Sequence, residues 1–352
     1  MGPSATIQHI RHIAAQGLGA RLAIPAMVDA MERLIPSRTR TFMWLDDDGN
    51  QTDMYEQQPI PEAIEAMIAA GPELAADPHA PSTNKMAQSP FEYGGWRVFE
   101  HFPGWDKSML KNEIFRRYGI GNNLDFPLRQ GRKTRAILAF GREPGSSSYT
   151  RREVEAMLGL RAHFLHALDC VDVTLSIEQA ATPDDPQILL VEPDGRIETS
   201  SPTAKLLLSQ LAGAWDGRNL VNVTSAPASL RELMRRLDLA EEGRNAQPPS
   251  QVISTPWGTI KVIAHQRTAG GEYVISLHRL VPRALARIRK AAFLDLSPRE
   301  REVAVAMCTS ANGEAIAQLV GLSPASYREY ARRIYGRLGV EGRIGVKDLL
   351  DS

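Results

Sequence analysis

The chain has 352 residues, of which 43% are hydrophobic and 23% are charged. This composition excludes a disordered chain, and the length allows two or three domains with hydrophobic cores. The two cysteines lack the spacing of a disulfide framework or a zinc site, no signal peptide is visible, and no stretch reaches the ~18 apolar residues that span a bilayer. We therefore expect a cytoplasmic protein without a membrane partner.

Residues 5–172 are expected to form a first domain in which helices surround an antiparallel sheet. Apolar residues at helical spacing predict an amphipathic helix over residues 21–35 and a long helix over residues 148–169. Strands are predicted at residues 41–45 and on both sides of the polar turn QGRKT. This order resembles a GAF-like sensor fold, which implies a domain that receives a small-molecule effector.

Two groups of polar residues in this domain have the composition of a metal site. The carboxylates of Asp46, Asp47 and Asp48 follow a predicted strand, but the stretch DDDGN also has the composition of a hairpin turn. The histidines form pairs three residues apart, which could chelate a metal if further ligands converged, yet no acidic partner completes either pair. We expect a hairpin turn, structural or surface histidines, and no metal. The histidine pairs are His9 with His12 and His163 with His166.

Four aromatic residues of the first domain are candidates for lining a ligand pocket. Pockets for apolar or aromatic small molecules are built from such side chains together with a few polar groups. The alternative is that they belong to the core of the domain. The four residues are Trp44, Trp96, Phe99 and Trp105.

No enzyme signature is complete. GIGNN has two glycines but not the third of a dinucleotide-binding loop, and QGRKT has Arg where a phosphate loop requires Gly before Lys. The sequence therefore predicts a protein that is not an enzyme and has no cofactor.

A second domain is expected after a linker over residues 173–187, which contains the Pro- and Asp-rich stretch ATPDDPQ. Residues 188–280 begin with a strand, a PDG turn, a strand and a helix, and they end with alternating strands. This order resembles PAS-like domains, which implies a dimerising or signal-transmitting role. Residues 281–292 are expected to form a helical connector.

The last segment, residues 293–352, is predicted to be all helical. Ser297 and Glu300 have the S-x-x-E spacing of a capping box, and Pro298 suits the first turn of a helix. A short helix with an apolar stripe and a turn at Gly321 follow, ahead of a longer helix. This stripe consists of Ile316, Leu319 and Val320.

The longer helix is predicted to run from Pro324, after a Ser323 cap, to Leu338, before Gly339. Its inner face is expected to carry Tyr327, Ala331, Ile334 and Leu338, whereas arginines fall off this stripe. The whole chain has a net charge of zero, but residues 283–352 contain twelve Lys or Arg against eight Asp or Glu. A short helix, a tight turn and a second helix with a basic face are typical of a helix-turn-helix.

At these residues the chain resembles the C-terminal DNA-binding module of LuxR-type (LuxR/GerE) bacterial transcription regulators. The resemblance is carried by LSPREREV, by AIAQLVGLSPASYREYARRIYGRLGV and by GRIGVKDLL. It implies readout of DNA bases by Arg328, Glu329 and Arg332. It also implies phosphate contacts by Ser326, Tyr330, Arg333, Arg337, Arg343 and Lys347.

The sequence departs from that family at several positions. Family members usually have Asn or a similar residue where Gly313 stands, Glu where Ala315 stands, and Val and His where Tyr327 and Tyr330 stand. These differences raise the alternative of a module that serves dimerisation more than DNA binding.

The fold class expected from the sequence is α+β and multidomain, with GAF-like and PAS-like antiparallel-sheet domains before a four-helix helix-turn-helix domain. The expected function is sequence-specific transcription regulation by a homodimer on double-stranded DNA, controlled by an effector at the N-terminal domains. Ile344, Leu349 and Leu350 are candidates either for the dimer contact or for the core of the module. The alternative function is a ligand-binding or protein-interaction protein whose helix-turn-helix mainly mediates assembly.

Overall fold

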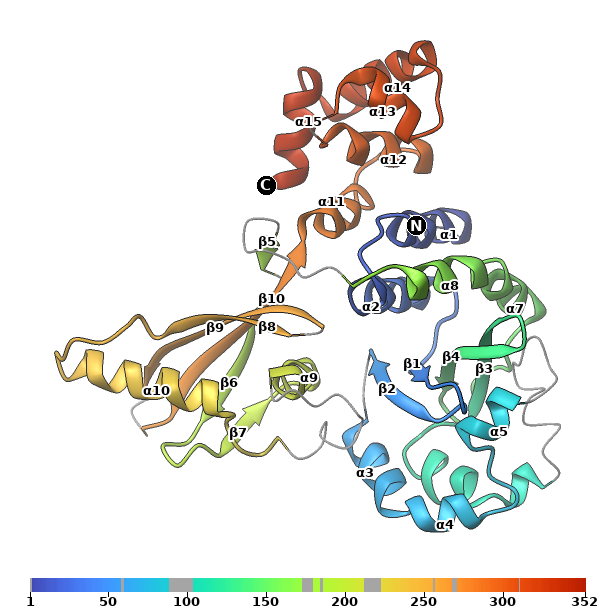
Figure 1. The fold of residues 1–352 in the computed structure, drawn as a ribbon, viewed down its shortest axis with the longest axis vertical. Coiled ribbons are helices and arrows are strands. Elements are labelled where there is room, and N and C mark those ends of the chain that lie inside the picture. Colours follow the sequence, from blue (N-terminus) through green and yellow to red (C-terminus); the bar gives the residue numbers. More distant parts are fainter. Residues whose placement is uncertain are drawn as a thin grey trace.

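The computed structural model describes residues 2–57, 60–88, 104–172, 180–183, 186–211, 223–255, 257–267, 271–309 and 311–352. Two separate antiparallel sheets and a C-terminal group of helices follow one another along the chain (Figure 1). The α+β class predicted from the sequence is therefore confirmed.

The first sheet has the strand order β2-β1-β4-β3. Its strands are β1 (Thr39–Leu45), β2 (Gln51–Glu56), β3 (Asn122–Gln130) and β4 (Lys133–Arg142), and all neighbours are antiparallel. The β1–β2 connection is the predicted hairpin turn, because the Asp46 carboxylate accepts the backbone N–H groups of Asp48 and Asn50 at 3.0 and 2.8 Å.

Four helices lie on one side of this sheet (Figure 1). They are α1 (Pro3–Ala14), α2 (Ala20–Ala30), α7 (Arg151–Leu158) and α8 (Arg161–Asp169). Of these, α2 and α8 contact the strands of the sheet, and α1 packs on α2 and α8. The prediction of one long helix over residues 148–169 is wrong, because the chain turns at Gly159 and Leu160 and thereby buries Leu160 completely. The remaining shorter elements are α3 (Pro61–Ala69), α4 (Gly71–Ala76), α5 (Thr83–Gln88), η2 (Trp105–Lys107) and the π-helical η3 (Leu110–Phe115). Of these, α5 packs on β4 of the sheet through Met86. A 3₁₀ turn, η1 (Met31–Arg33), extends α2.

The second sheet has the order β7-β6-β10-β9-β8, and β5 pairs with β10. Its strands are β5 (Ala180–Pro183), β6 (Gln187–Val191), β7 (Ile197–Ser200), β8 (Ser250–Thr255), β9 (Gly258–Arg267) and β10 (Tyr273–Pro282). Two helices, α9 (Pro202–Leu211) and α10 (Ala228–Glu241), pack on this sheet and complete a separate hydrophobic core. Strand β5 lies within the stretch that the sequence predicts as a linker.

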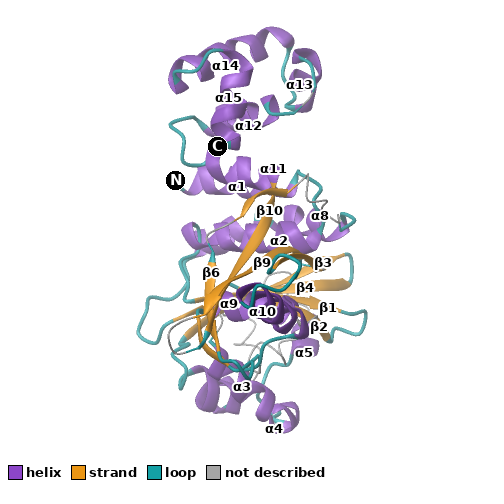
Figure 2. Ribbon diagram, turned by 90° about the vertical axis from the view of Figure 1, so that its left-hand side faces the viewer, coloured by secondary structure: helices purple, strands orange, loops and turns teal. Residues whose placement is uncertain are grey.

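Helix α11 (Arg283–Ala291) leads from β10 into four further helices, which stand at one end of the molecule (Figures 1 and 2). These are α12 (Pro298–Met307), α13 (Gly313–Leu319), α14 (Pro324–Leu338) and α15 (Gly342–Asp351). Both halves of the Ser297–Glu300 capping box are formed, and Asn312 and Ser323 cap α13 and α14. The left-handed Gly339, at φ 64°, ends α14 as predicted.

The first domain and the C-terminal helices share one hydrophobic core. This core runs from Ile10 on α1 through Ile288 on α11 to Val303 on α12, and it continues to Leu350 on α15. The C-terminal helices therefore dock on α1 through α11 and α12, which leaves α14 on the far side.

Candidate nucleic-acid interface

Helix α14 is held by its apolar face and exposes its polar face. Ala331 and Ile334 are buried against the core, and Tyr327 and Leu338 pack partly buried beside them, as the sequence predicts. Ile316 and Ala317 of α13 are buried, and so is Val320, which directly follows this helix. The expectation that Leu319 lies on this inner face is wrong: it is 66% exposed, because the helical period turns it away from the face that the other three residues form.

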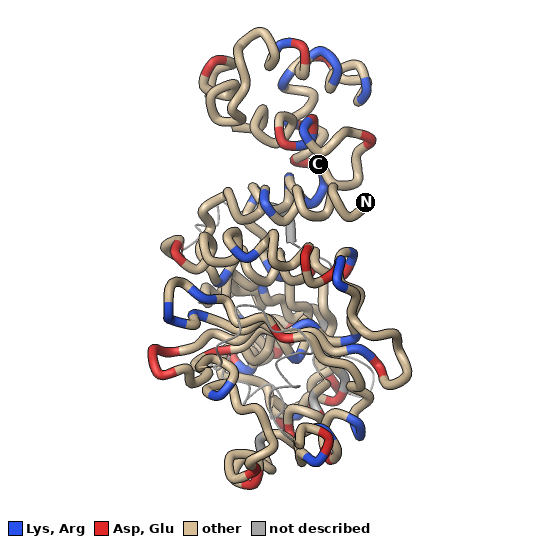
Figure 3. The backbone as a smooth tube through the Cα atoms, turned by 90° about the vertical axis from the view of Figure 1, so that its right-hand side faces the viewer, with Lys and Arg blue, Asp and Glu red and all other residues tan. Residues whose placement is uncertain are grey.

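The exposed face of α14 is rich in arginine. Arg328, Arg332, Arg333 and Arg337 are all exposed, and Figure 3 shows Lys and Arg recurring along the C-terminal helices. Within the described part of the chain, the Arg328 guanidinium has no hydrogen bond or ion pair. Its five N–H donors are thus available for an external acceptor.

Glu329 forms ion pairs with two of the other arginines. Its carboxylate accepts Arg333 Nε at 3.1 Å and Arg332 Nη2 at 3.0 Å, in i,i+4 and i,i+3 pairs. The hydrogen bonds from Arg333 and then Arg332 hold the pKa of Glu329 below its ordinary value, so the carboxylate is ionised at neutral pH. Exposed ion pairs of this kind are weak, which means that a nucleic acid can compete for each partner.

The remaining candidates on α14 have neighbours within the module. The Ser326 hydroxyl lies 2.9 Å from the Ser323 hydroxyl, and the Arg333 guanidinium lies 5.5 Å from the centre of the Tyr330 ring. Arg337 Nη1 donates to Glu300 Oε2 at 3.2 Å. This bond ties the last turn of α14 to the buried capping box of α12.

The two candidates on α15 differ from each other. Arg343 donates from Nε to the Met307 carbonyl and from Nη1 to the Ala311 carbonyl, each at 2.6 Å, and from Nη2 to the Thr309 carbonyl. These carbonyls belong to the end of α12 and the loop that follows it, so Arg343 positions this segment. Lys347 is exposed and has no hydrogen bond or ion pair among the described residues.

Two departures from the family pattern face each other in the structure. A Cβ added at Gly313 would lie 3.3 Å from Cε1 of Tyr327, which is closer than ordinary van der Waals contact. The missing side chain at the start of α13 therefore makes room for the large ring on α14. The sequence alone shows both substitutions but not that they are in contact.

Trp44 and Trp105, the two described candidates for a pocket in the first domain, each pack against another aromatic ring. Trp44 is buried, and its ring packs edge-on at 5.2 Å against Trp257, which comes from the turn between β8 and β9. The Arg21 guanidinium lies 4.0 Å from the Trp257 ring centre and 5.1 Å from that of Trp44. Trp44 thus belongs to a contact between the two sheet domains. Trp105 packs edge-on against Phe115 at 6.0 Å. Trp96 and Phe99 lie outside the described residues.

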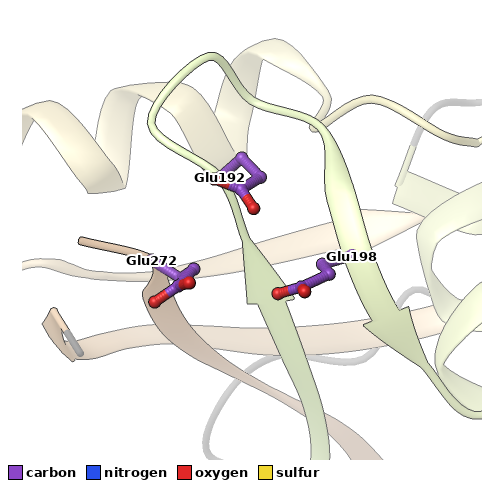
Figure 4. Close-up of side chains that lie close together, drawn as sticks. All are labelled: Glu192, Glu198 and Glu272. Atoms are coloured by element: carbon purple, nitrogen blue, oxygen red, sulfur yellow. The ribbon is translucent and has the colours of Figure 1, made fainter. Parts of the chain in front are cut away.

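Three glutamates at one end of the second sheet come together although they are distant in sequence. Glu192, Glu198 and Glu272 bring one carboxylate oxygen each within 4.8 Å of one another (Figure 4). Glu198 is exposed and the other two are half-buried. A cluster of carboxylates near the surface does not by itself define a cation site, because solvent can screen it.

No helix in the described part of the chain combines the length and apolar character that a membrane crossing requires.

Comparison with known proteins gives only distant similarities. No protein-family model matches the chain, and no curated protein matches it. The solved structure of SdiA in complex with octanoyl-rac-glycerol aligns at 11% identity over 99% of this chain and 87% of that chain, with a TM-score of 0.27. A Vibrio cholera VqmA–ligand–DNA complex aligns at 14% identity over 50% of this chain and 87% of that chain, with a TM-score of 0.21. The E. coli DhaR(N)–DhaL complex aligns at 12% identity over 79% and 90% of the two chains, with a TM-score of 0.23. Because identities and TM-scores are this low, the function proposed below depends on the chain's own residues.

Proposed function

We propose that this protein is a sequence-specific DNA-binding transcription regulator whose helix-turn-helix consists of α13 and α14. The observation that carries the proposal is the asymmetry of α14. Its apolar face is locked into the core, while its opposite face presents four arginines to solvent. A helix of this size with an exposed basic face fits the major groove of DNA.

The geometry supports different roles for the exposed residues, some in base contacts and others in phosphate contacts. Arg328 is free to donate two hydrogen bonds to guanine O6 and N7. Arg332 can exchange its weak bond with Glu329 for a base, and Glu329 can accept from cytosine N4. Phosphate contacts are assigned to the surrounding cations and hydroxyls. These residues are Ser326, Tyr330, Arg333, Arg337 and Lys347.

Arg343 is assigned a different role. In the LuxR-type resemblance its position implies a phosphate contact, but its guanidinium already satisfies three backbone carbonyls. We therefore assign it to positioning α15 against the end of α12.

A single recognition helix reads too few base pairs for specificity, so the proposal includes a homodimer on a two-fold operator. On α15, Leu350 is buried in the core of the module, whereas Ile344 is 75% exposed. Of the candidates for a dimer contact, Ile344 has the more accessible apolar side chain. An effector bound to the N-terminal domains would shift the population of DNA-competent dimers.

The rival function is an assembly module that binds protein rather than DNA. The two are separated by titrating the full-length protein into labelled random-sequence duplexes over a series of salt concentrations. Phosphate contacts predict an affinity that falls steeply with salt, and Arg333→Ala should reduce the slope of the log–log plot by about 1. Arg152→Ala, an exposed arginine on α7, is the matched control and should leave the slope unchanged. Absence of binding, or an affinity indifferent to salt, would favour the assembly function.

A further inference from the structure

A cavity of about 360 Å³ lies where the first domain meets the C-terminal helices. Helices α1 and α8 form one side of it, and α11 and α12 form the other. Figure 1 shows α1 and α11 next to each other at this junction, and residues of α1 also contact α8 and α12. The volume falls at the lower end of the range for small-molecule sites, ~300 to 1,000 Å³.

Both histidine pairs of the sequence line this one cavity. His9 and His12 reach it from α1, and His163 and His166 reach it from α8. The pairs are more than a hundred residues apart in the chain, so their convergence could not be seen from spacing alone. The contact between α1 and α8 creates it.

The cavity has an excess of positive and potentially positive groups. Arg11 on α1 and Arg301 on α12 line it together with the four imidazoles. Among the described residues that line it, Glu302 is the only one with a carboxylate, and Glu302 is already ion-paired with Arg299. Hydrogen-bond donors therefore outnumber the acceptors available to them.

The titration of the histidines reflects this environment. Burial first, and then the neighbouring charges of His12, Arg33, Arg289 and Arg301, together lower the pKa of His9 to about 4. Burial also lowers the pKa of His12, against the attraction of Glu302. Burial, then Arg11 and His166, lower the pKa of His163. These three imidazoles are thus neutral at neutral pH, and a bound negative charge would favour their protonation.

Arg301 adds an unsatisfied donor. Its Nη2 donates to the Leu294 carbonyl at 3.0 Å, but its Nε is buried without a hydrogen-bond partner among the described residues. A buried N–H of a charged group without an acceptor is costly, and a bound ligand with an acceptor atom would remove that cost.

We propose that this junction cavity binds a small oxyanion, such as the carboxylate or phosphate group of a metabolite, through Arg301, Arg11 and the histidines that line it. Neutral imidazoles are also metal ligands, but two observations disfavour a cation. Arginines surround the site, and among the described residues no three His, Cys, Asp or Glu side chains at this cavity bring their ligand atoms within 4.8 Å of one another. A charge-assisted bond from a guanidinium to an oxyanion needs no such convergence.

An occupant of this cavity would touch the sensor helices and the helix-turn-helix scaffold together. It would therefore bias how α12 sits on α1 and, through the shared core, where α14 is held. This regulatory consequence rests on the proposed function, whereas oxyanion binding itself does not.

The test is calorimetric titration of the full-length protein, without DNA, with inorganic phosphate in one arm and citrate in the other. Each is measured at about pH 6 and about pH 8, on either side of the ordinary range for histidine. We expect at least one of the two to bind at a single site, more tightly at the lower pH because binding takes up protons. The arm that binds distinguishes a phosphate from a carboxylate ligand.

One variant is placed on each side of the cavity, so that misfolding of a single domain cannot explain a loss of binding in both. Arg301→Gln on α12 and His12→Asn on α1 should each weaken binding about tenfold or more, which corresponds to about 1.4 kcal/mol. The exposed Arg152→Gln on α7 should leave it unchanged. Circular dichroism reports whether each variant is folded.

Binding that is absent in both arms, or equal in the wild type and in both folded cavity variants, would overturn the proposal. So would binding of Zn²⁺ that depends on the histidines when neither oxyanion binds. DNA affinity of the same unliganded preparations is measured separately, so a failure here is distinguishable from a failure of the DNA-binding function.

Discussion

At the scale of single residues, Gly313 and Tyr327 show how two unusual positions can compensate for each other. Each alone departs from the LuxR-type pattern, and each alone would suggest a weakened helix-turn-helix. In the structure the ring of Tyr327 occupies the space that a side chain at residue 313 would need. The pair therefore preserves the packing of α13 on α14 with a different set of side chains.

This contact makes a quantitative prediction for a double-mutant cycle. Ala normally stabilises a helix relative to Gly, by up to about 1 kcal/mol in the helix interior. Gly313→Ala should give less than this benefit in the wild type, because the new methyl group meets the Tyr327 ring. In the Tyr327→Val background the same change should be more favourable by at least about 0.5 kcal/mol. Urea unfolding of the four proteins measures the coupling, and additive effects would show that the two side chains do not interact.

At the scale of elements, α15 is attached to the scaffold of α12 by a guanidinium. Arg343 donates to the Met307 carbonyl at the end of α12 and to the Ala311 carbonyl in the loop that follows, so for Met307 it has the role of a C-terminal cap supplied from another helix. Lys347 stands one turn later on the same helix and is exposed. The two cations therefore differ in their surroundings, although the LuxR-type resemblance implies a phosphate contact for both.

The pair Arg343 and Lys347 separates stability from DNA binding. Arg343→Ala should lower the free energy of unfolding by about 1 to 3 kcal/mol, because it leaves partly buried carbonyls without donors. Lys347→Ala should leave thermal unfolding unchanged and weaken DNA binding alike for all sequences. Thermal denaturation and duplex titration of both variants check this. If the Arg343→Ala protein is as stable as the wild type, the positioning role is contradicted and Arg343 is again a candidate for a phosphate contact.

Local sequence signals account for the elements that were predicted well. Ser297 with Glu300, Ser323 and Gly339 act within one helical turn of their own positions, so the ends of α12 and α14 could be read directly. The turn at Gly159 was missed because apolar residues continue at helical spacing through α7 and α8, and this periodicity outweighed the glycine at the end of α7.

At the scale of the whole molecule, the features missed by the sequence are contacts between distant segments. Trp44 looked like a candidate pocket residue, but Trp257 and Arg21 enclose it in a contact that joins the two sheets. The histidine pairs on α1 and α8 gave no sign of sharing a cavity. Such contacts depend on how complete elements pack, and no local pattern of residues records that packing.

The shared core also explains how a signal in one part could reach another. The C-terminal helices are continuous in packing with α1, α2 and α8, so α14 is not tethered by a free linker. Under the proposed function, a change in the first domain would reach α14 through α11 and α12.

The most direct test of the central claim is selection of bound duplexes from a random DNA pool by the full-length protein. We predict enrichment of a palindrome whose half-sites are about one helical turn apart, and loss of that motif in both Arg328→Ala and Arg332→Ala. Arg152→Ala should select the same motif as the wild type. Failure of the wild-type protein to enrich any motif, or enrichment of one that persists in both recognition-helix variants, would contradict the assignment of α14 as the element that reads DNA.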